Sequence, residues 1–93
     1  MRPDEIALGV AANCSLEPLK VPCFTLIDAL QTTRPDRAVE ALFLTAALAA
    51  QSAGLDGHEM LARARRQIAD ADAVKNPHFE AIRDYAGGEL RNR

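Results

Sequence analysis

Aromatic residues are scarce in this sequence, which has three Phe, one Tyr and no Trp among 93 residues. Alanine supplies much of the 48% hydrophobic content instead, so a core built from it buries little apolar surface per residue. A chain of this length has room for one core, and residues 1–93 therefore form a single domain. Because association adds buried surface to a thin core, we expect the chain to self-associate.

Neither sign of charge is in excess, since 11 basic and 13 acidic side chains give a formal net charge of −2. This balance provides no overall field that would attract nucleic acid or an anionic membrane. The sequence also lacks the run of about 18 apolar residues that spans a bilayer, and its start lacks the pattern of a secretion signal. We therefore expect a cytoplasmic protein in which Cys14 and Cys23 are reduced thiols.

Residues that carry catalytic or metal chemistry are few and scattered. His58-Glu59 begins an H-E-x-x-H zinc motif, but Ala62 stands where the second histidine should be. The sequence has no glycine-rich phosphate loop, no G-x-S-x-G elbow and no dense group of carboxylates. We expect no catalytic residue, no metal site and no cofactor, and hence a protein that is not an enzyme.

The dominant feature is a long apolar run over residues 38–50, which predicts a central helix buried on most of its circumference. On a helical wheel its main apolar arc contains Ala38, Val39, Leu42, Phe43, Ala46, Ala49, Ala50 and Ala53. A second, narrower stripe contains Ala41, Leu44 and Leu48 and cannot face the same neighbours. Either other helices of this chain cover the second stripe, or another subunit does.

Local signals divide the chain into helices, and the fold class they predict is an all-α bundle of four or five helices around the central one. The expected helices cover residues 3–12, 22–32, 35–53, 57–73 and 77–90, the last of them continuing through two glycines. Thr33, Asp56 and Asn76 are the predicted N-caps, and Glu59 completes a capping box with Asp56. Gly54 suits the left-handed position that ends the central helix.

The helix over residues 57–73 has a predicted core face and a divided outer side. The core face contains Met60, Leu61, Ala64, Ile68 and Ala71. On the outer side Ala62, Ala69 and Ala73 form a strip of small residues that allows close approach of another helix. We expect a homo-oligomer interface made by Leu44 and Leu48, together with Ala62 and Ala69 of this strip.

One basic cluster, Arg63, Arg65 and Arg66, lies on this same helix. Glu59 is the expected partner of Arg63 and Asp70 that of Arg66, but no acid lies three or four residues from Arg65. A guanidinium without a local acid can bind a phosphate or carboxylate. The predicted ligand-binding residues are therefore Arg65, Arg63, Arg66 and His58, with pairing of Arg65 across helices or subunits as the alternative.

Residues 50–60 also carry the alanine, glycine and apolar spacing of a DNA-binding helix-turn-helix. The helix before the turn is long and apolar for that motif, and Arg63 stands where an apolar anchor belongs. Glu59, Asp70 and Asp72 would bring negative charge toward phosphates. DNA binding is therefore the alternative function and not the main one.

Two stretches, GLDGHEMLARARR over residues 54–66 and FEAIRDYAGGEL over residues 79–90, resemble small helical proteins of bacteriophages and prophages. The resemblance implies an accessory protein in a bacterial host cell and brings no catalytic residue. Small phage proteins of this class include binders of host proteins and sponges for cyclic-nucleotide defence signals. Sponges favour a long helix with an arginine and a Leu-x-Leu-Thr-like run; Arg37 and residues 42–45 are loosely similar, whereas the tryptophan expected further on is missing.

Together these features predict a homo-oligomer that acts by binding. Its target is a small anionic ligand such as a cyclic nucleotide, or a host protein that contacts exposed helix faces. A structural or assembly role in the phage is a further alternative.

Overall fold

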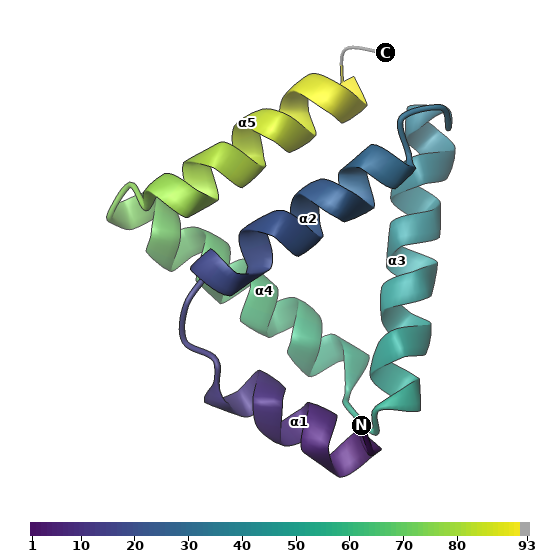
Figure 1. The fold of residues 1–93 in the computed structure, drawn as a ribbon, viewed down its shortest axis with the longest axis vertical. Helices are drawn as coiled ribbons and strands as arrows, with labels where there is room; N and C mark the ends of the chain where they lie inside the picture. The colour runs from purple at the N-terminus through teal and green to yellow at the C-terminus, as the bar shows by residue number, and fades with distance from the viewer. Residues whose placement is uncertain (92–93) are drawn as a thin grey trace.

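The computed structural model describes residues 1–91, which form five α-helices and no strand (Figure 1). In chain order they are α1 (Pro3–Ala12), α2 (Glu17–Ala29), α3 (Pro35–Ser52), α4 (Gly57–Ala73) and α5 (Pro77–Arg91). The predicted all-α class is confirmed.

The signals for the turns around α4 are confirmed in detail. Gly54 has a φ of 72°, and the N–H of Leu55 donates to the Ala50 carbonyl at 2.8 Å, which closes the end of α3. The Asp56 carboxylate accepts from two N–H groups in the first turn of α4, at 2.8 and 3.4 Å. Asn76 caps α5 in the same way, at 2.9 and 3.2 Å. These ends depend on a few adjacent residues, which is why the sequence predicted them.

The predicted start of α2 at Pro22 is wrong, because the helix begins at Glu17 and contains Pro22 in its interior. The Ser15 hydroxyl accepts from the Glu17 N–H at 3.2 Å, and Pro18 fits the first turn, where its missing N–H costs nothing. Pro22 therefore removes only one backbone hydrogen bond from a helix that tertiary contacts support. The helix ends at Ala29, three residues earlier than predicted.

Two predicted caps also differ in the structure. Arg34, not Thr33, occupies the N-cap position of α3, and its side chain makes no cap hydrogen bond. Its guanidinium instead pairs with Asp36 at 2.9 Å. In the described part of the chain, Glu59 does not return a hydrogen bond to Asp56, so the capping box is only half formed.

The closest packing joins α2 and α5, which run side by side (Figure 1). The rings of Phe24 and Tyr85 lie 4.7 Å apart between centroids, and the Tyr85 hydroxyl donates to the Asp28 carboxylate. Nearby, the Gln31 amide donates to Glu89 at 2.9 Å. The aromatic contact and the Tyr85–Asp28 hydrogen bond therefore join α2 to α5, and Gln31 adds a bridge from the residues that follow α2.

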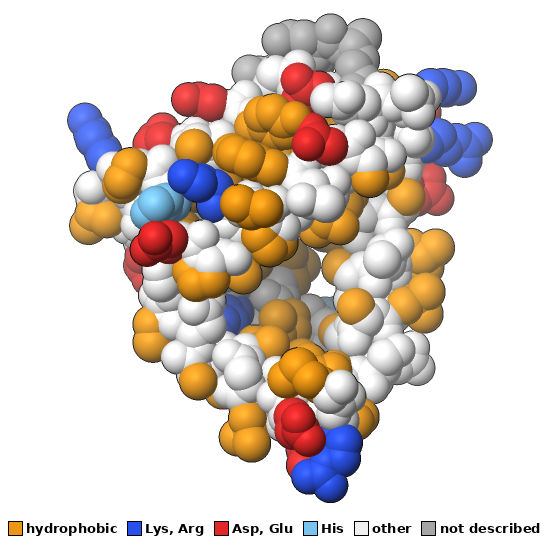
Figure 2. All heavy atoms as spheres, viewed as in Figure 1, with side chains coloured by type: hydrophobic (Ala, Val, Ile, Leu, Met, Phe, Trp, Pro, Cys, Tyr) orange, Lys and Arg blue, Asp and Glu red, His pale blue; other side chains and the backbone are white. Residues whose placement is uncertain are grey.

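α3 lies along one side of the molecule instead of at its centre (Figure 1). Together with α4 and the α2–α5 pair it encloses a hollow that is visible in the space-filling view (Figure 2). Within α3 only Ala38 and Ala50 are buried, whereas Phe43 is 61% exposed and Val39 is also exposed. The expectation that this helix is buried on most of its circumference is therefore wrong for the single chain. A helical wheel shows which residues could be buried, but not whether another helix reaches them.

The predicted core face of α4 is only partly buried, for the same reason. Ala71 is buried and Met60 and Ala64 are half-buried, as expected. Leu61 and Ile68, however, are exposed, so their assignment to the core is wrong. No helix in the described part of the chain covers the side of α4 that carries them.

The open arrangement is also apparent in the total surface. The chain exposes 6866 Å², whereas a folded monomer of 10.1 kDa is expected to expose about 5,300 Å². Its radius of gyration is 13.8 Å, against about 12.3 Å for a compact domain of this length. Roughly 1,600 Å² of surface that a typical monomer would bury is therefore accessible.

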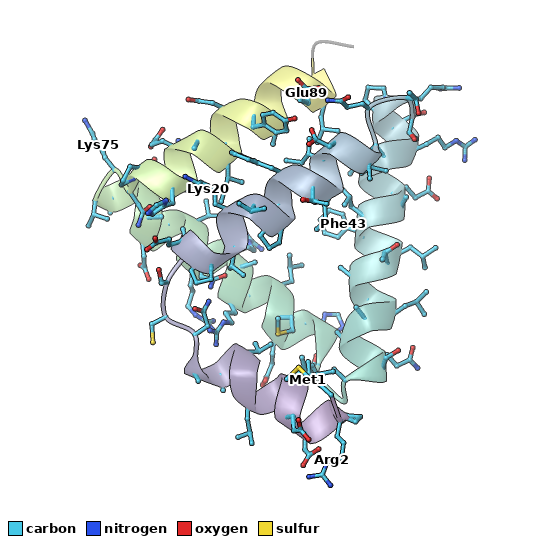
Figure 3. The ribbon with its side chains drawn as sticks, in the orientation of Figure 1. Met1, Arg2, Lys20, Phe43, Lys75 and Glu89 are labelled. Atoms are coloured by element: carbon cyan, nitrogen blue, oxygen red, sulfur yellow. The ribbon has the colours of Figure 1, made fainter. Side chains whose placement is uncertain are left out.

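Replacing Lys75 with Gly is expected to raise the free energy of unfolding by about 0.5–1 kcal/mol. Lys75 follows α4 with a φ of 52°, a conformation that a side chain disfavours, and it points away from the molecule at the α4–α5 turn (Figure 3). Lys20→Gly, inside α2, is the matched control and should instead lose about 1 kcal/mol. Urea unfolding measures both variants, and a loss of stability in Lys75→Gly would contradict this explanation of the turn.

Candidate functional site

The four predicted ligand-binding residues all lie on α4, but the helix distributes them over two faces. Arg63 and Arg66 line a hollow between α4 and α1. Arg65 lies about 160° around the helix from Arg63, and His58 lies seven residues before Arg65 on the same face. The structure therefore brings Arg63 and Arg66 together and places Arg65 with His58 elsewhere.

Arg63 is tied to a distant part of the chain. Its guanidinium donates to the backbone carbonyl of Asn13, at 2.5 Å, in the connection between α1 and α2. The side chain is half-buried, and the residue also lines the hollow between α1 and α4. Arg63 thus holds α4 to the α1–α2 connection, a contact across 50 residues that no local pattern in the sequence could indicate.

The predicted intrahelical ion pairs of the basic cluster are absent from residues 1–91. Arg63 does not pair with Glu59, and Arg66 does not pair with Asp70. The ion pairs in that part of the chain are Arg2–Asp4, Arg2–Glu5, Arg34–Asp36 and Arg83–Asp72. Exposed pairs of this kind usually contribute at most about 1 kcal/mol each to stability.

Arg65 is exposed, and its guanidinium makes no hydrogen bond or ion pair within the described residues. Leu61 and Ile68 lie four residues before it and three residues after it, and both are exposed. His58 is also exposed and lies on the same side of α4, one turn before Leu61. An unpaired cation is therefore surrounded by exposed apolar side chains, on a face turned away from α1.

The hollow between α1 and α4 has a volume of about 390 Å³ and is open to solvent. Its lining residues are Ala7, Val10, Ala11, Leu55, Glu59, Met60, Ala62, Arg63 and Arg66. The Glu59 carboxylate in this lining opposes binding of an anion, and the Arg63 guanidinium is already directed to Asn13. Arg66 is left as the principal cation available to a ligand there.

Two apolar surfaces of α3 and α4 have no cover from the described chain. The open face consists of Val39 and Phe43 on α3 and Leu61 and Ile68 on α4, all of them exposed. Phe43 projects from α3 toward the hollow between α2, α3 and α4 (Figure 3).

The outer stripe, the second of these surfaces, consists of Ala41, Leu44 and Leu48 on α3. Leu44 is 62% and Leu48 53% exposed, and Ala41 is also exposed. Hydrophobic side chains gather along this edge of the molecule in Figure 2. Of the two explanations offered by the sequence, cover by other helices of the same chain is therefore ruled out for residues 1–91.

The strip of small residues on α4 is exposed as well. Ala62 lines the hollow beside α1, while Ala69 and Ala73 lie further along the helix. The predicted interface residues Leu44 and Leu48 are therefore on α3, at the outer edge, and Ala62 and Ala69 are on another face of the molecule.

Two titratable side chains in the described chain have shifted pKa values, and neither belongs to a metal-binding cluster. Burial raises the pKa of the half-buried Cys23 thiol, and Cys14 is exposed. The hydrogen bond to Asp28 raises the pKa of Tyr85, so this hydroxyl stays protonated at neutral pH. Within residues 1–91, no three His, Cys, Asp or Glu side chains lie close enough to hold a metal ion.

No single helix in the described range is long and apolar enough to cross a membrane. α3 and α4 reach the required length and hydropathy only when taken together, and they are bent by 119° at the turn between them.

Arg63→Ala is expected to lower the free energy of unfolding by about 1.5–3 kcal/mol, because it removes a charged donor from the Asn13 carbonyl. Arg65→Ala is the matched control on the same helix and should change stability by less than about 0.5 kcal/mol. Chemical unfolding measures both variants. Equal losses would show that the contact between Arg63 and Asn13 does not join α4 to the α1–α2 connection.

Comparison with known proteins gives no match to any family model, to any curated protein or to any solved structure.

Proposed function

We propose that this chain is a non-enzymatic accessory protein of phage type that binds a protein of its bacterial host through the open face. The observation that carries the proposal is the position of Arg65, an exposed and unpaired guanidinium beside the exposed side chains of Leu61 and Ile68. Protein interfaces combine an apolar centre with arginine in this manner. The partner should present an apolar segment with a carboxylate near it.

The apolar character of the open face supports a protein target over a small ligand. A small-ligand site usually contains a few convergent polar groups, whereas Val39, Phe43, Leu61 and Ile68 are all apolar. A group of large apolar side chains that are exposed together is typical of interaction sites.

Affinity capture from a bacterial host lysate, followed by identification of the retained proteins, tests the proposal. Phe43→Asp and Arg65→Glu should each abolish retention of a protein that the natural chain holds, because they place a negative charge on or beside the open face. Leu8→Asp, an equally exposed apolar position on α1, is the control and should retain it. The same retained proteins with all variants would contradict the proposal.

A second candidate function is DNA binding, because α3, residues 53–56 and α4 have helix-turn-helix geometry. The connection is four residues long, contains Gly54 and bends the chain by 119°. Against this reading, Arg65 and Arg66 share the exposed surface of α4 with Glu59 and Asp70. Binding to duplex DNA that weakens steeply with salt would favour this candidate.

A thermal-shift screen separates these targets from a small anion. A ligand at 100 times its dissociation constant stabilises the fold by about 2.7 kcal/mol. Cyclic nucleotides and duplex DNA form the two arms of the screen. A shift with a cyclic nucleotide that Arg66→Ala abolishes would favour the hollow beside α1 and contradict the host-protein proposal, whereas no shift in either arm supports it.

A further inference from the structure

The outer stripe of α3 has the spacing of a helix–helix seam. Arg37 lies four residues before Ala41, and Gln51 lies three residues after Leu48, on the same side of the helix. The five positions are therefore separated by four, three, four and three residues, which is the repeat of a coiled-coil seam. From Arg37 to Gln51 the seam extends along about 21 Å of α3 without a covering helix in the described chain.

The surface available matches what a pair of chains would bury. A standard protein interface removes about 800 Å² from each partner. The chain exposes roughly 1,600 Å² more than a typical monomer of its mass, so one such interface accounts for about half of the excess. The open face is left accessible, because Phe43 lies about 100° around α3 from Leu44.

We infer that a second copy of this chain covers the outer stripe, with the two α3 helices antiparallel and related by a two-fold axis. In this register Leu44 of each copy packs on Leu48 of the other, and Ala41 lies opposite Gln51. Every apolar position of the stripe then gains a neighbour from the partner, as an isologous interface requires.

Charge selects the antiparallel direction. The last turn of α3 has no basic residue to complement the negative end of the helix dipole. Antiparallel pairing brings Arg37 of each copy beside that end of the partner's helix. Parallel pairing would instead bring the two Arg37 side chains together, and within residues 1–91 the Arg37 guanidinium has no ion pair to offset the repulsion.

Light scattering after size exclusion at tens of micromolar tests the assembly. The natural chain should have about twice its 10.1 kDa mass. Leu44→Glu/Leu48→Glu should halve that mass while circular dichroism shows the same helix content, because both side chains are exposed in the single chain. Leu8→Glu/Val21→Glu changes two equally exposed apolar positions elsewhere and should leave the pair intact.

Arg37→Ala tests the direction of the helices. An antiparallel pair loses two favourable contacts with helix ends, which should raise its dissociation constant roughly three- to thirty-fold. A parallel pair would lose a repulsion and become tighter.

Three results would overturn the inference: a monomeric natural chain, a mass above two copies, or a Leu44→Glu/Leu48→Glu variant that stays paired. A tighter pair in Arg37→Ala would overturn its antiparallel arrangement. These results do not bear on the proposed host protein, because its binding is tested with Phe43→Asp on the open face and the pair is tested with Leu44→Glu/Leu48→Glu on the outer stripe. A monomer that still captures its target through Phe43 would refute the pair and leave the proposed function standing.

Discussion

Phe79→Ala is expected to lower the free energy of unfolding by about 3–5 kcal/mol, the usual range for a large aromatic removed from a core. Phe79 is only 8% exposed and lies in the first turn of α5, next to the Asn76 cap. The Arg83 guanidinium lies 4.4 Å from the centre of its ring and also pairs with Asp72 at 3.1 Å. The substitution therefore leaves a cavity and loosens the contact between α4 and α5.

Phe43→Ala is the matched control for this prediction. The same atoms are removed, but the Phe43 ring is 61% exposed, so little burial is lost and stability should fall by less than about 1 kcal/mol. Urea unfolding of both variants, carried out without any partner protein, gives the comparison. Similar losses in the two variants would show that these burial differences do not describe the chain in solution.

Ile27→Ala is expected to cost about 2–5 kcal/mol of unfolding free energy. Ile27 is 6% exposed and is the buried residue of α2. It follows Phe24 by one turn on the side of the helix that contacts α5. Because α2 and α5 form the closest helix pair, a cavity between them should weaken the whole fold.

The preceding residue provides the control. Leu26 is 54% exposed, so Leu26→Ala removes little buried surface and also introduces the residue with the highest helix propensity. Its effect should stay within about 1 kcal/mol in the same unfolding measurement. If Leu26→Ala proves the more damaging of the two, the assignment of α2 faces is reversed.

The helix boundaries that were predictable from the sequence are those fixed by neighbouring residues. Asp56, Asn76 and Gly54 each act on backbone groups no more than four residues away, so their identity is enough to locate an end. The start of α2 was missed because two prolines compete for the same role. Ser15 decides between them through a hydrogen bond to the N–H of Glu17.

Burial was less predictable, because it depends on which elements meet. Phe43, Leu61 and Ile68 have the spacing of core residues, yet no helix of the described chain covers them. The contact of Arg63 with Asn13 and that of Tyr85 with Asp28 link residues 50 and 57 positions apart. Neither contact has a local pattern, so the sequence could not indicate how α4 and α5 are held.

For the candidate site, the sequence predicted that Arg65 alone in the basic cluster lacks an intrahelical acid. Arg65 has no partner in residues 1–91, but neither has Arg66, because its predicted pair with Asp70 does not form there. The separation of Arg65 from Arg63 and Arg66 follows from helix geometry. The sequence could not indicate which side of α4 faces α1, because that depends on how the helices pack. Because α1 packs beside Arg63 and Arg66, these two residues line the hollow between α1 and α4. Arg65 does not line this hollow and lies beside the open face.

The central claim is that a second copy of this chain covers the outer stripe of α3, where Leu44 and Leu48 are exposed in the single chain. Hydrogen–deuterium exchange of the natural chain, compared at low nanomolar and tens of micromolar concentration, tests this claim most directly. The claim predicts slower exchange at the higher concentration over residues 37–51, with α1 unchanged. Equal exchange of α3 at both concentrations would contradict it.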